Sequence, residues 1–465
     1  MKASRGVLLV ALALLAIAAV RDLARLGDAL PWRQLYDFAD FYCAGATLDR
    51  GEDPYRYEPL HRCEHSVNET AAFRADPGRV VPAPLPPYDF PPLMLAARLS
   101  FANARVVDAI AIAIAVGLSM WGLALVTGRL DVAVLALLLP AGFVLLNAGQ
   151  VVPFALAALV FCGVALARGL DRLAGILAAL TLIEPHLGLP VCAAMLCWLP
   201  RSRLGLIATL FVLASLGILL AGVAGAAEYV ARVLPGQALA EASYVYQYSL
   251  TYLLRMLGVP TGGALLAGEL SYAAMAVFGV WLGRSVAQRL ERPELVAYIP
   301  GACSVIAGPY VHMVDLAFAI PATMVLATSL RGRSRELAVV ALCLLAVPWV
   351  LVWISKRLFL ASLFVVAALL LRLKSNPAVA IALFVGVAAS IYLLELAPPA
   401  PLVAITPGIY SAADLAQKAW RAYVAQLGGA SIAWLLVKIP SWLALAAMVA
   451  SALTVLRPQR VAQRQ

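Results

Sequence analysis

Runs of apolar residues separated by short polar turns occur along almost the whole chain. About fourteen can be counted, and several are shorter than the ~20 residues that a helix needs to cross a bilayer. The runs cover residues 6–20, 106–127, 132–148, 151–167, 173–185, 187–199, 204–226, 264–283, 295–307, 313–330, 337–354, 358–371, 378–396 and 441–456. They do not alternate apolar and polar residues as barrel strands do. The pattern therefore predicts an all-α fold, a polytopic membrane helical bundle of about 12–14 transmembrane or re-entrant helices.

Basic residues lie in alternate turns between these runs. If the amino end is inside, the inner turns contain the arginines at 129, 168–172, 201–203, 284–292, 331–335 and 372, whereas the short outer turns have none. Only residues 356 and 357 break this pattern, which follows the positive-inside rule. The first run has the charged and apolar regions of a signal peptide, but we expect it to be a retained helix because this topology needs its amino end inside.

Three longer stretches fall on the outer side, at 21–105, 228–263 and 397–440. We divide the chain accordingly into a transmembrane module, 1–396, whose first extracytoplasmic loop is 21–105, and a second part, 397–465, with the last outer loop and the last helix. The first loop opens with a helix-like pattern at 37–48, which "RGEDPY" ends. Gly51 can adopt a positive φ there, and Pro54 cannot continue a helix.

The composition agrees with a membrane protein. Hydrophobic residues make up 63 % of the chain and charged residues 13 %, against about half and a quarter in soluble domains. The net charge of +10 comes from clusters between apolar runs, which is typical of membrane orientation rather than nucleic-acid binding. We expect a multi-pass integral membrane protein, with membrane lipids and no nucleic acid among its partners.

The seven cysteines include no CxxC motif. Cys43 and Cys63 share the first outer loop, where they could either pair in an oxidising compartment or remain reduced. In "HRCEH", His61, Cys63 and His65 alternate like metal ligands, but an ordinary polar loop explains this string better. We expect no metal and no other cofactor.

Polar residues of the kinds found in active sites gather in the outer turns. Asp37 and Asp40 lie in "LYDFADFYCAG", while "NAGQ", "IEPH" and "VHMVD" contain Asn147, Gln150, Glu184, His186, His312 and Asp315. One such residue alone would be satisfied as a helix cap or by snorkelling to the interface. Several turns that converge on one membrane face favour a functional site.

These motifs resemble glycosyltransferase family 87. The string "DFADFYCAGATLDRGEDPY" is similar to the family's opening signature, an Asp-led helix followed by Gly and then Asp-Pro-Tyr. "YDFPPL" from Tyr88 resembles its Tyr and Pro-Pro step, "NAGQ" its Gly-Gln turn, and "GPYVHMVD" its late turn. The four motifs span residues 37–315. The resemblance implies a type-C glycosyltransferase fold and a polyprenyl-phosphate-sugar donor used outside the cytoplasm.

The resemblance also implies roles for the outer polar residues. Asp37 would be the catalytic general base, and Asp40 would lie three residues on, at about the same helix face. We assign substrate binding to Asp40, Tyr88, Asn147, Gln150, Glu184, His186, His312 and Asp315. The two histidines would donate to the donor phosphate, whereas Asn147 and Gln150 suit sugar hydroxyls. The chain departs from the family at Glu184, where a lysine usually precedes the proline.

We therefore expect a membrane hexosyltransferase. It would transfer a hexose such as mannose from a polyprenyl-phosphate sugar to a lipid or glycan acceptor, with its active site on the periplasmic side of a bacterial plasma (inner) membrane. Two alternatives stay open. One is a transporter or flippase for a lipid-linked saccharide, although transporters usually bind near the bilayer midplane and often contain repeated halves. The other is a non-catalytic relative that acts as an assembly subunit.

Overall fold

The computed structural model describes residues 37–67, 78–352, 356–396, 414–427 and 432–457. These residues form helices and no sheet, and two isolated β-bridges join Arg56 to Leu415 and Gln247 to His312. The outer and early helices are α2 (Phe38–Asp49), α3 (Tyr57–Val67), α5 (Phe90–Ala97), α6 (Phe101–Thr127), α7 (Leu130–Leu137), α8 (Leu146–Ala148), α9 (Val152–Ala167), α10 (Asp171–Leu180), α11 (Pro185–Trp198) and α12 (Arg203–Glu228). The later helices are α13 (Leu234–Ala240), α14 (Leu250–Met256), α15 (Thr261–Leu290), α16 (Leu295–Ser304), α17 (Ile320–Ser329), α18 (Gly332–Leu345), α19 (Trp349–Val352), α20 (Lys356–Arg372), α21 (Pro377–Leu396), α22 (Ala416–Gln426), α23 (Ile432–Leu436) and α24 (Ile439–Leu456).

Five helical stretches of the described chain are long and apolar enough to cross a membrane. They are Phe101–Thr127, Leu130–Ala148, Pro200–Ala240, Thr261–Leu290 and Ile432–Leu456, and six shorter apolar helices accompany them. Every predicted apolar run from 106 onward overlaps one or two helices, while the run at 6–20 lies outside the described residues. The prediction of an all-helical, multi-pass membrane protein is thus confirmed.

Prolines and glycines set the ends of the short helices that carry the outer turns. Glu184 is extended, with φ −116° and ψ 92°, and Pro185 then begins α11, where its missing N–H has no cost. Gly149, with φ 71°, ends α8 in the left-handed conformation that favours glycine, and α9 starts three residues later. At these two turns the chain therefore passes from one apolar helix to the next within a few residues.

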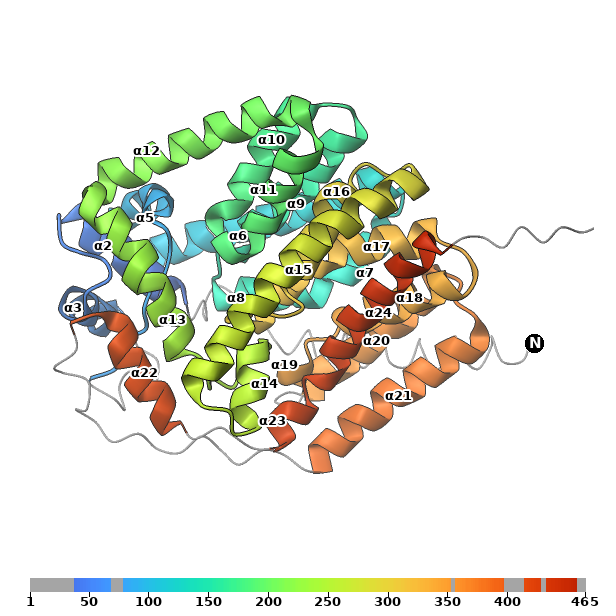
Figure 1. Ribbon diagram of the computed structural model, residues 1–465. Coiled ribbons are helices and arrows are strands. Elements are labelled where there is room, and N and C mark those ends of the chain that lie inside the picture. Colours follow the sequence, from blue (N-terminus) through green and yellow to red (C-terminus); the bar gives the residue numbers. More distant parts are fainter. Residues whose placement is uncertain (1–36, 68–77, 353–355, 397–413, 428–431, 458–465) are drawn as a thin grey trace, which may run out of the picture.

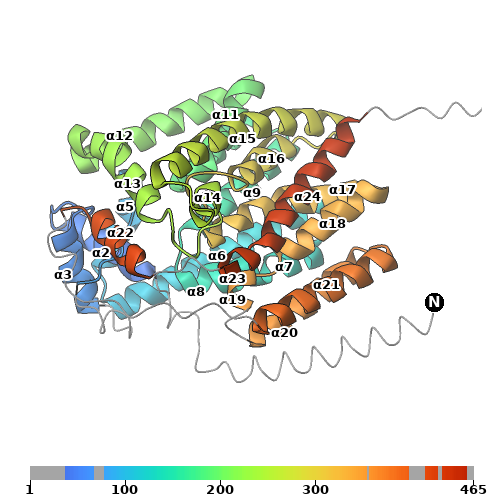
Figure 2. The ribbon, with the colours of Figure 1, turned by 60° about the horizontal axis from the view of Figure 1, so that its bottom comes forward.

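The described residues form two hydrophobic cores. The larger one runs through the helix bundle, and the smaller one joins α2, α3, α5, α13 and α22. Figures 1 and 2 show these five helices gathered at one end of the bundle, on the left of Figure 1. We call these helices, together with the described segments that adjoin them, the outer layer. It contains segments from all three stretches predicted to lie outside, and α22 shares a hydrophobic core with α2 and α3. The domain boundary between 396 and 397 stays a prediction.

The first outer helix has the predicted form. Residue Asp37 precedes α2, and Gly51 follows it with φ 76°. Cys43 of α2 and Cys63 of α3 form a disulfide, which settles the alternative left open by the sequence. On the other side of α2, Gly45 packs against the main chain of Leu93 in α5. A disulfide and a close helix contact thus fix the position of α2.

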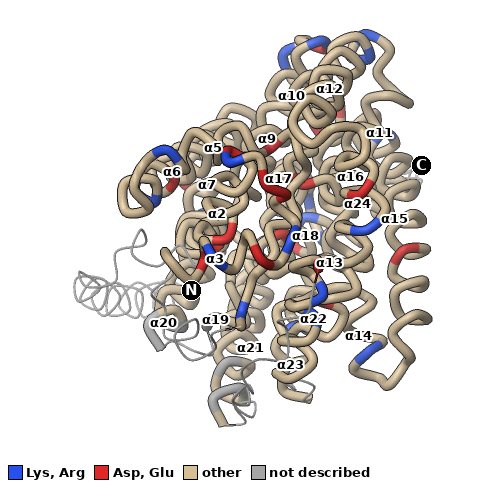
Figure 3. The backbone as a smooth tube through the Cα atoms, turned by 90° about the vertical axis from the view of Figure 1, so that its left-hand side faces the viewer, with Lys and Arg blue, Asp and Glu red and all other residues tan. Residues whose placement is uncertain are grey.

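Charged residues are few along the helices and gather in particular turns. Figure 3 shows most of the helical tube without charged residues, and Lys and Arg gathered where α10 and α12 turn. Ion pairs link the parts of the outer layer: Arg56 contacts Glu228 at 2.9 Å and Asp414 at 3.6 Å, and Arg232 contacts Glu228 at 2.6 Å. These partly exposed pairs contribute little stability individually, but they connect three separate segments.

Candidate active site

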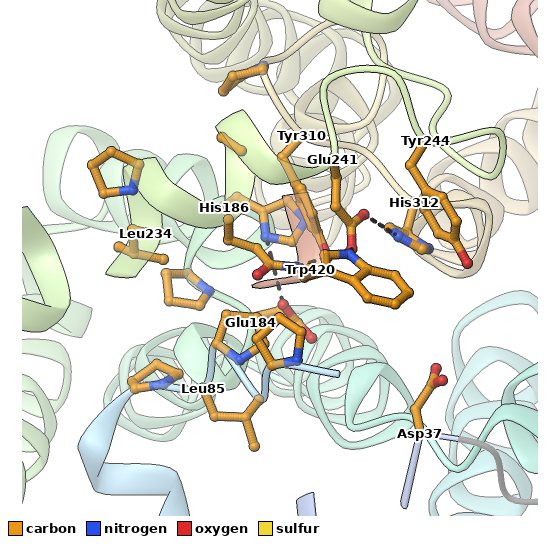
Figure 4. A pocket seen from close by; sticks show the side chains of 18 of the residues that line it. Asp37, Leu85, Glu184, His186, Leu234, Glu241, Tyr244, Tyr310, His312 and Trp420 are labelled. Carbon is orange, nitrogen blue, oxygen red and sulfur yellow. Dashed lines mark hydrogen bonds and ion pairs between the residues drawn. The ribbon is translucent and has the colours of Figure 1, made fainter. Parts of the chain in front are cut away.

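A cavity of about 470 Å³ lies where the outer layer meets the helix bundle. The outer layer contributes α2, the proline-rich segment 79–86, α13 and α22, and the bundle contributes the turns at 150, 184–186 and 309–312 together with α15. Its lining includes Asp37, Asp40, Arg79, Gln150, Glu184, His186, Glu241, Tyr244, Glu269, Tyr272, Tyr310, His312 and Trp420. The predicted outer turns therefore do converge on one cavity (Figure 4).

The first wall of the cavity centres on Asp37. Its main-chain N–H donates to the carbonyl of Ala148 at 2.8 Å, and its carboxylate accepts a hydrogen bond from the Gln150 amide. The left-handed Gly149 between these two partners turns the chain so that both can reach Asp37. Burial raises the pKa of Asp37, and the bond from Gln150 partly offsets that rise. The opening signature and the Gly-Gln turn thus form one unit.

Asp40 lies deeper in the same wall. It is 2 % exposed, and one of its carboxyl oxygens has no hydrogen-bond partner. Burial raises the pKa of Asp40 well above its ordinary range, and the neighbouring Glu64 and Asp37 raise it further. Glu64 is fully buried and accepts a bond from the Val81 N–H at 3.0 Å. Burial and the neighbouring carboxylates therefore favour the protonated form of Asp40, whereas the bond from Gln150 favours the carboxylate of Asp37, so Asp37 is the better candidate for a base.

The second wall contains the two histidines, each held by a carboxylate. His186 Nε2 is 3.1 Å from Asp315, while its Nδ1 is 3.5 Å from Glu184. His312 Nε2 is 2.7 Å from Glu241, and the His312 main-chain N–H donates to Asp315 at 2.6 Å. Asp315 does not line the cavity, but it connects both histidines. In Figure 4 the Asp37 carboxylate points toward the side where Glu241 and His312 meet.

Aromatic side chains line the rest of the second wall, next to the two histidines. Tyr310 lies between the histidines, 5.3 Å from the His186 ring and 5.5 Å from the His312 ring. Tyr244 follows, 5.8 Å from His312 and 5.5 Å from Trp420 of α22. The guanidinium of Arg79 lies 5.8 Å from the Trp420 ring centre. Arg79 is the one arginine or lysine among the described residues that line the cavity.

Besides Asp315, two predicted binding residues do not reach the cavity wall. The Asn147 amide donates to the Phe143 carbonyl at 2.9 Å, and the Tyr88 hydroxyl donates to the Leu182 carbonyl at 2.8 Å. Both side chains are thus hydrogen-bonded to main-chain carbonyls. Their roles in substrate binding stay predictions.

Sequence reasoning missed Arg79, Glu241, Tyr244, Tyr310 and Trp420. Tyr310 lies inside a quoted motif and could have been included for its ring. The others lie in long outer stretches without periodicity, where only an isolated charge or aromatic residue marks them. Trp420 is 3 % exposed and belongs to the cavity wall.

The site can bind a polar molecule and take up a proton from it. One wall offers a carboxylate beside an amide, and the other offers two imidazoles whose carboxylate partners favour the protonated, cationic form. Such a pair of walls suits a ligand with hydroxyl groups on one side and an anionic group on the other. Among the described residues, no group of three or more His, Cys, Asp or Glu side chains is placed to hold a metal ion.

The fold and the site together define a multi-pass α-helical membrane protein with a polar cavity beneath an outer helical layer. Comparisons of the chain with protein-family models, with curated proteins and with solved structures found no match. The resemblance to glycosyltransferase family 87 therefore rests on the four motifs alone.

Proposed function

We propose that this protein is a membrane glycosyltransferase that transfers a hexose, such as mannose, from a polyprenyl-phosphate sugar to a lipid or glycan acceptor. The observation that carries the proposal is the contact between Asp37 and Gln150 in a cavity that His186 and His312 also line. Residues from three of the four motifs thus line one cavity, although these motifs are spread over 37–315. The proposed family is the one that the four motifs resemble, and the spatial relation between the motifs adds support for it.

The chemistry needs a base near the acceptor and positive charge near the leaving group. Asp37 takes the proton from an acceptor hydroxyl as that oxygen attacks the anomeric carbon of the donor sugar. The bond from the anomeric carbon to the phosphate oxygen breaks, and the polyprenyl phosphate leaves as an anion. His186, His312 and Arg79 are the cationic or imidazole groups of the cavity that can stabilise this developing charge.

Glu184 is placed unfavourably for direct contact with a phosphate, because two anions repel. Its carboxylate instead lies 3.5 Å from His186 Nδ1, and Asp315 lies at the other ring nitrogen. Two carboxylates on one imidazole favour the imidazolium form. In this proposal Glu184 acts through His186, so a cation still faces the donor where the family usually has a lysine.

The location of the cavity supports work on the periplasmic side of a bacterial plasma membrane. The positive-inside pattern assigns the outer layer to that side. The Cys43–Cys63 disulfide lies in the outer layer, and disulfides persist in oxidising compartments such as the periplasm. Both observations support the same orientation independently.

The test is transfer of radiolabelled sugar by the purified protein. Synthetic polyprenyl-phosphate mannose and glucose serve as donors, and membrane lipid extract supplies acceptors. We expect labelled product with the wild type, and a loss of about 10³-fold or more with Asp37→Asn, because the amide cannot accept the proton. Equal turnover by folded Asp37→Asn would remove Asp37 from the role of base.

A matched control separates loss of the base from loss of local charge. Asp53→Asn makes the same change in the outer layer at a residue that bonds to Arg56 and does not line the cavity. We expect this variant to transfer sugar like the wild type. No product from the folded wild type with either donor would contradict the proposed function.

A further inference from the structure

Glu241 is a buried carboxylate at the centre of the second wall. It follows α13 and is 5 % exposed. Four side chains donate to it: Gln237 at 2.9 Å and Trp420 at 3.0 Å to one oxygen, and Gln247 at 2.6 Å and His312 at 2.7 Å to the other. Four donors around one carboxyl group suit the ionised form, which accepts at both oxygens.

The donors come from separate parts of the chain. Gln237 belongs to α13 and Trp420 to α22, whereas Gln247 and His312 meet in an isolated β-bridge. Gln247 also accepts a bond from the Val311 N–H at 2.9 Å, directly before His312. Glu241 thus connects the outer layer, through Trp420, to the turn that presents His312.

We infer that Glu241 is a positioning residue that holds His312 on the cavity wall in its cationic form, ready to meet the phosphate of the donor. The identity of that ligand rests on the proposed function, but the Glu241–His312 relation does not. Glu241 acts through His312 and through Trp420, and the transferred sugar does not need to touch it.

The electrostatics around His312 agree with this role. Burial opposes a charge on the ring, but the Glu241 carboxylate outweighs it and raises the pKa of His312 to about 9. Asp315 and Asp37 raise the pKa further. The other titratable groups that face His312 are Glu184, His186, Tyr244 and Tyr310. Of all these groups, Glu241 has the largest effect in favour of the imidazolium.

The first experiment measures the charge on His312 without any assay of transfer. The chain contains four histidines, so ¹⁵N-histidine NMR of the detergent-solubilised protein gives few signals, and His312→Gln identifies the one from His312. We expect this signal to titrate near pH 9 in the wild type. We expect Glu241→Gln to lower the midpoint by roughly 1–3 pH units, as removal of an adjacent opposite charge does.

Two further variants make the result specific. Glu241→Asp keeps the charge and should restore most of the shift. Glu228→Gln makes the same chemical change at an outer-layer residue that pairs with Arg56 and Arg232, so it should leave the midpoint unchanged. A wild-type midpoint at or below about 6.5, the ordinary histidine value, would overturn the inference even if no Glu241 variant folds.

The transfer assay then tests the consequence for function. Glu241→Gln should lose transfer at pH 8 about 10-fold more than at pH 6, because its His312 is neutral at the higher pH. Equal losses at both pH values, with unchanged NMR midpoints, would contradict the positioning role. An inactive wild type whose His312 still titrates near pH 9 would contradict the proposed function and leave this inference standing.

Discussion

Gly45 offers a test of whether the position of α2 controls the site. A Cβ atom at Gly45 would lie 2.5 Å from the carbonyl carbon of Leu93 and 2.7 Å from its oxygen. Carbon atoms in contact prefer separations of about 3.5–4.0 Å, so Gly45→Ala must push α2 about 1 Å away from α5. The obstacle is main chain of α5, which cannot rotate aside as a flexible side chain would.

Two effects should follow from this displacement. Overpacking of a close helix contact lowers the free energy of unfolding by about 1–3 kcal/mol. Asp37 directly precedes α2, so its carboxylate should move relative to Gln150, and a misplacement of about 1 Å can reduce catalysis about 100-fold. We expect Gly45→Ala to lower the thermal midpoint in detergent and to reduce sugar transfer much more than that midpoint implies.

Gly117→Ala is the matched control for this experiment. Gly117 lies within α6, and a Cβ atom there would meet nothing within 4 Å. Alanine favours a helix over glycine by about 0.5–1 kcal/mol, so this variant should be at least as stable as the wild type. If Gly45→Ala and Gly117→Ala had the same thermal midpoint and the same transfer rate, the proposed contact between α2 and α5 would be wrong.

Two other predictions concern the outer layer. The Cys43–Cys63 disulfide closes a loop with a sequence separation of 20, so its reduction should lower the free energy of unfolding by about 3 kcal/mol and lower the thermal midpoint. A Cys43→Ala, Cys63→Ala variant should not respond to reductant. An unchanged wild-type midpoint would contradict the prediction. The pKa of Asp40 is higher in the folded protein than in the unfolded chain, where it is about 3.9. The stability of the fold therefore does not suffer from Asp40 below about pH 3.9, and it decreases as the pH rises through the folded pKa and the carboxyl must ionise. Asp40→Asn should therefore raise the thermal midpoint at pH 8 relative to the wild type and have less effect at pH 4, and a larger gain at pH 4 would contradict this assignment.

Sequence patterns predicted the helices well because the membrane fixes where apolar runs can lie. Runs such as 106–127 and 151–167 coincide with α6 and α9 within a few residues. The turns between them were also predictable, since Gly149 and Pro185 each interrupt a helix for a local steric reason. Local rules were sufficient wherever the controlling interaction was local.

The candidate site was predictable only in part. Asp37, Gln150, His186 and His312 were expected at the outer face, and they line one cavity. Asn147 and Tyr88 do not line the cavity and donate to main-chain carbonyls instead, which the sequence pattern does not show. Glu241 escaped prediction because its partners His312 and Trp420 are 71 and 179 residues away in the chain.

The helices could be predicted from the sequence better than the candidate site for a physical reason. Hydropathy and charge bias fix the position of a residue along the membrane normal, which is one coordinate of three. The other two depend on how helices pack side by side, and that packing uses close contacts of small residues, such as Gly163 against Tyr298 and Gly279 against Cys303. Hydropathy and charge bias therefore predict which residues lie at the outer face, but the lateral packing of the helices determines that Glu241 contacts His312. A variant that loosens such a contact within the bundle should change the site without changing the topology.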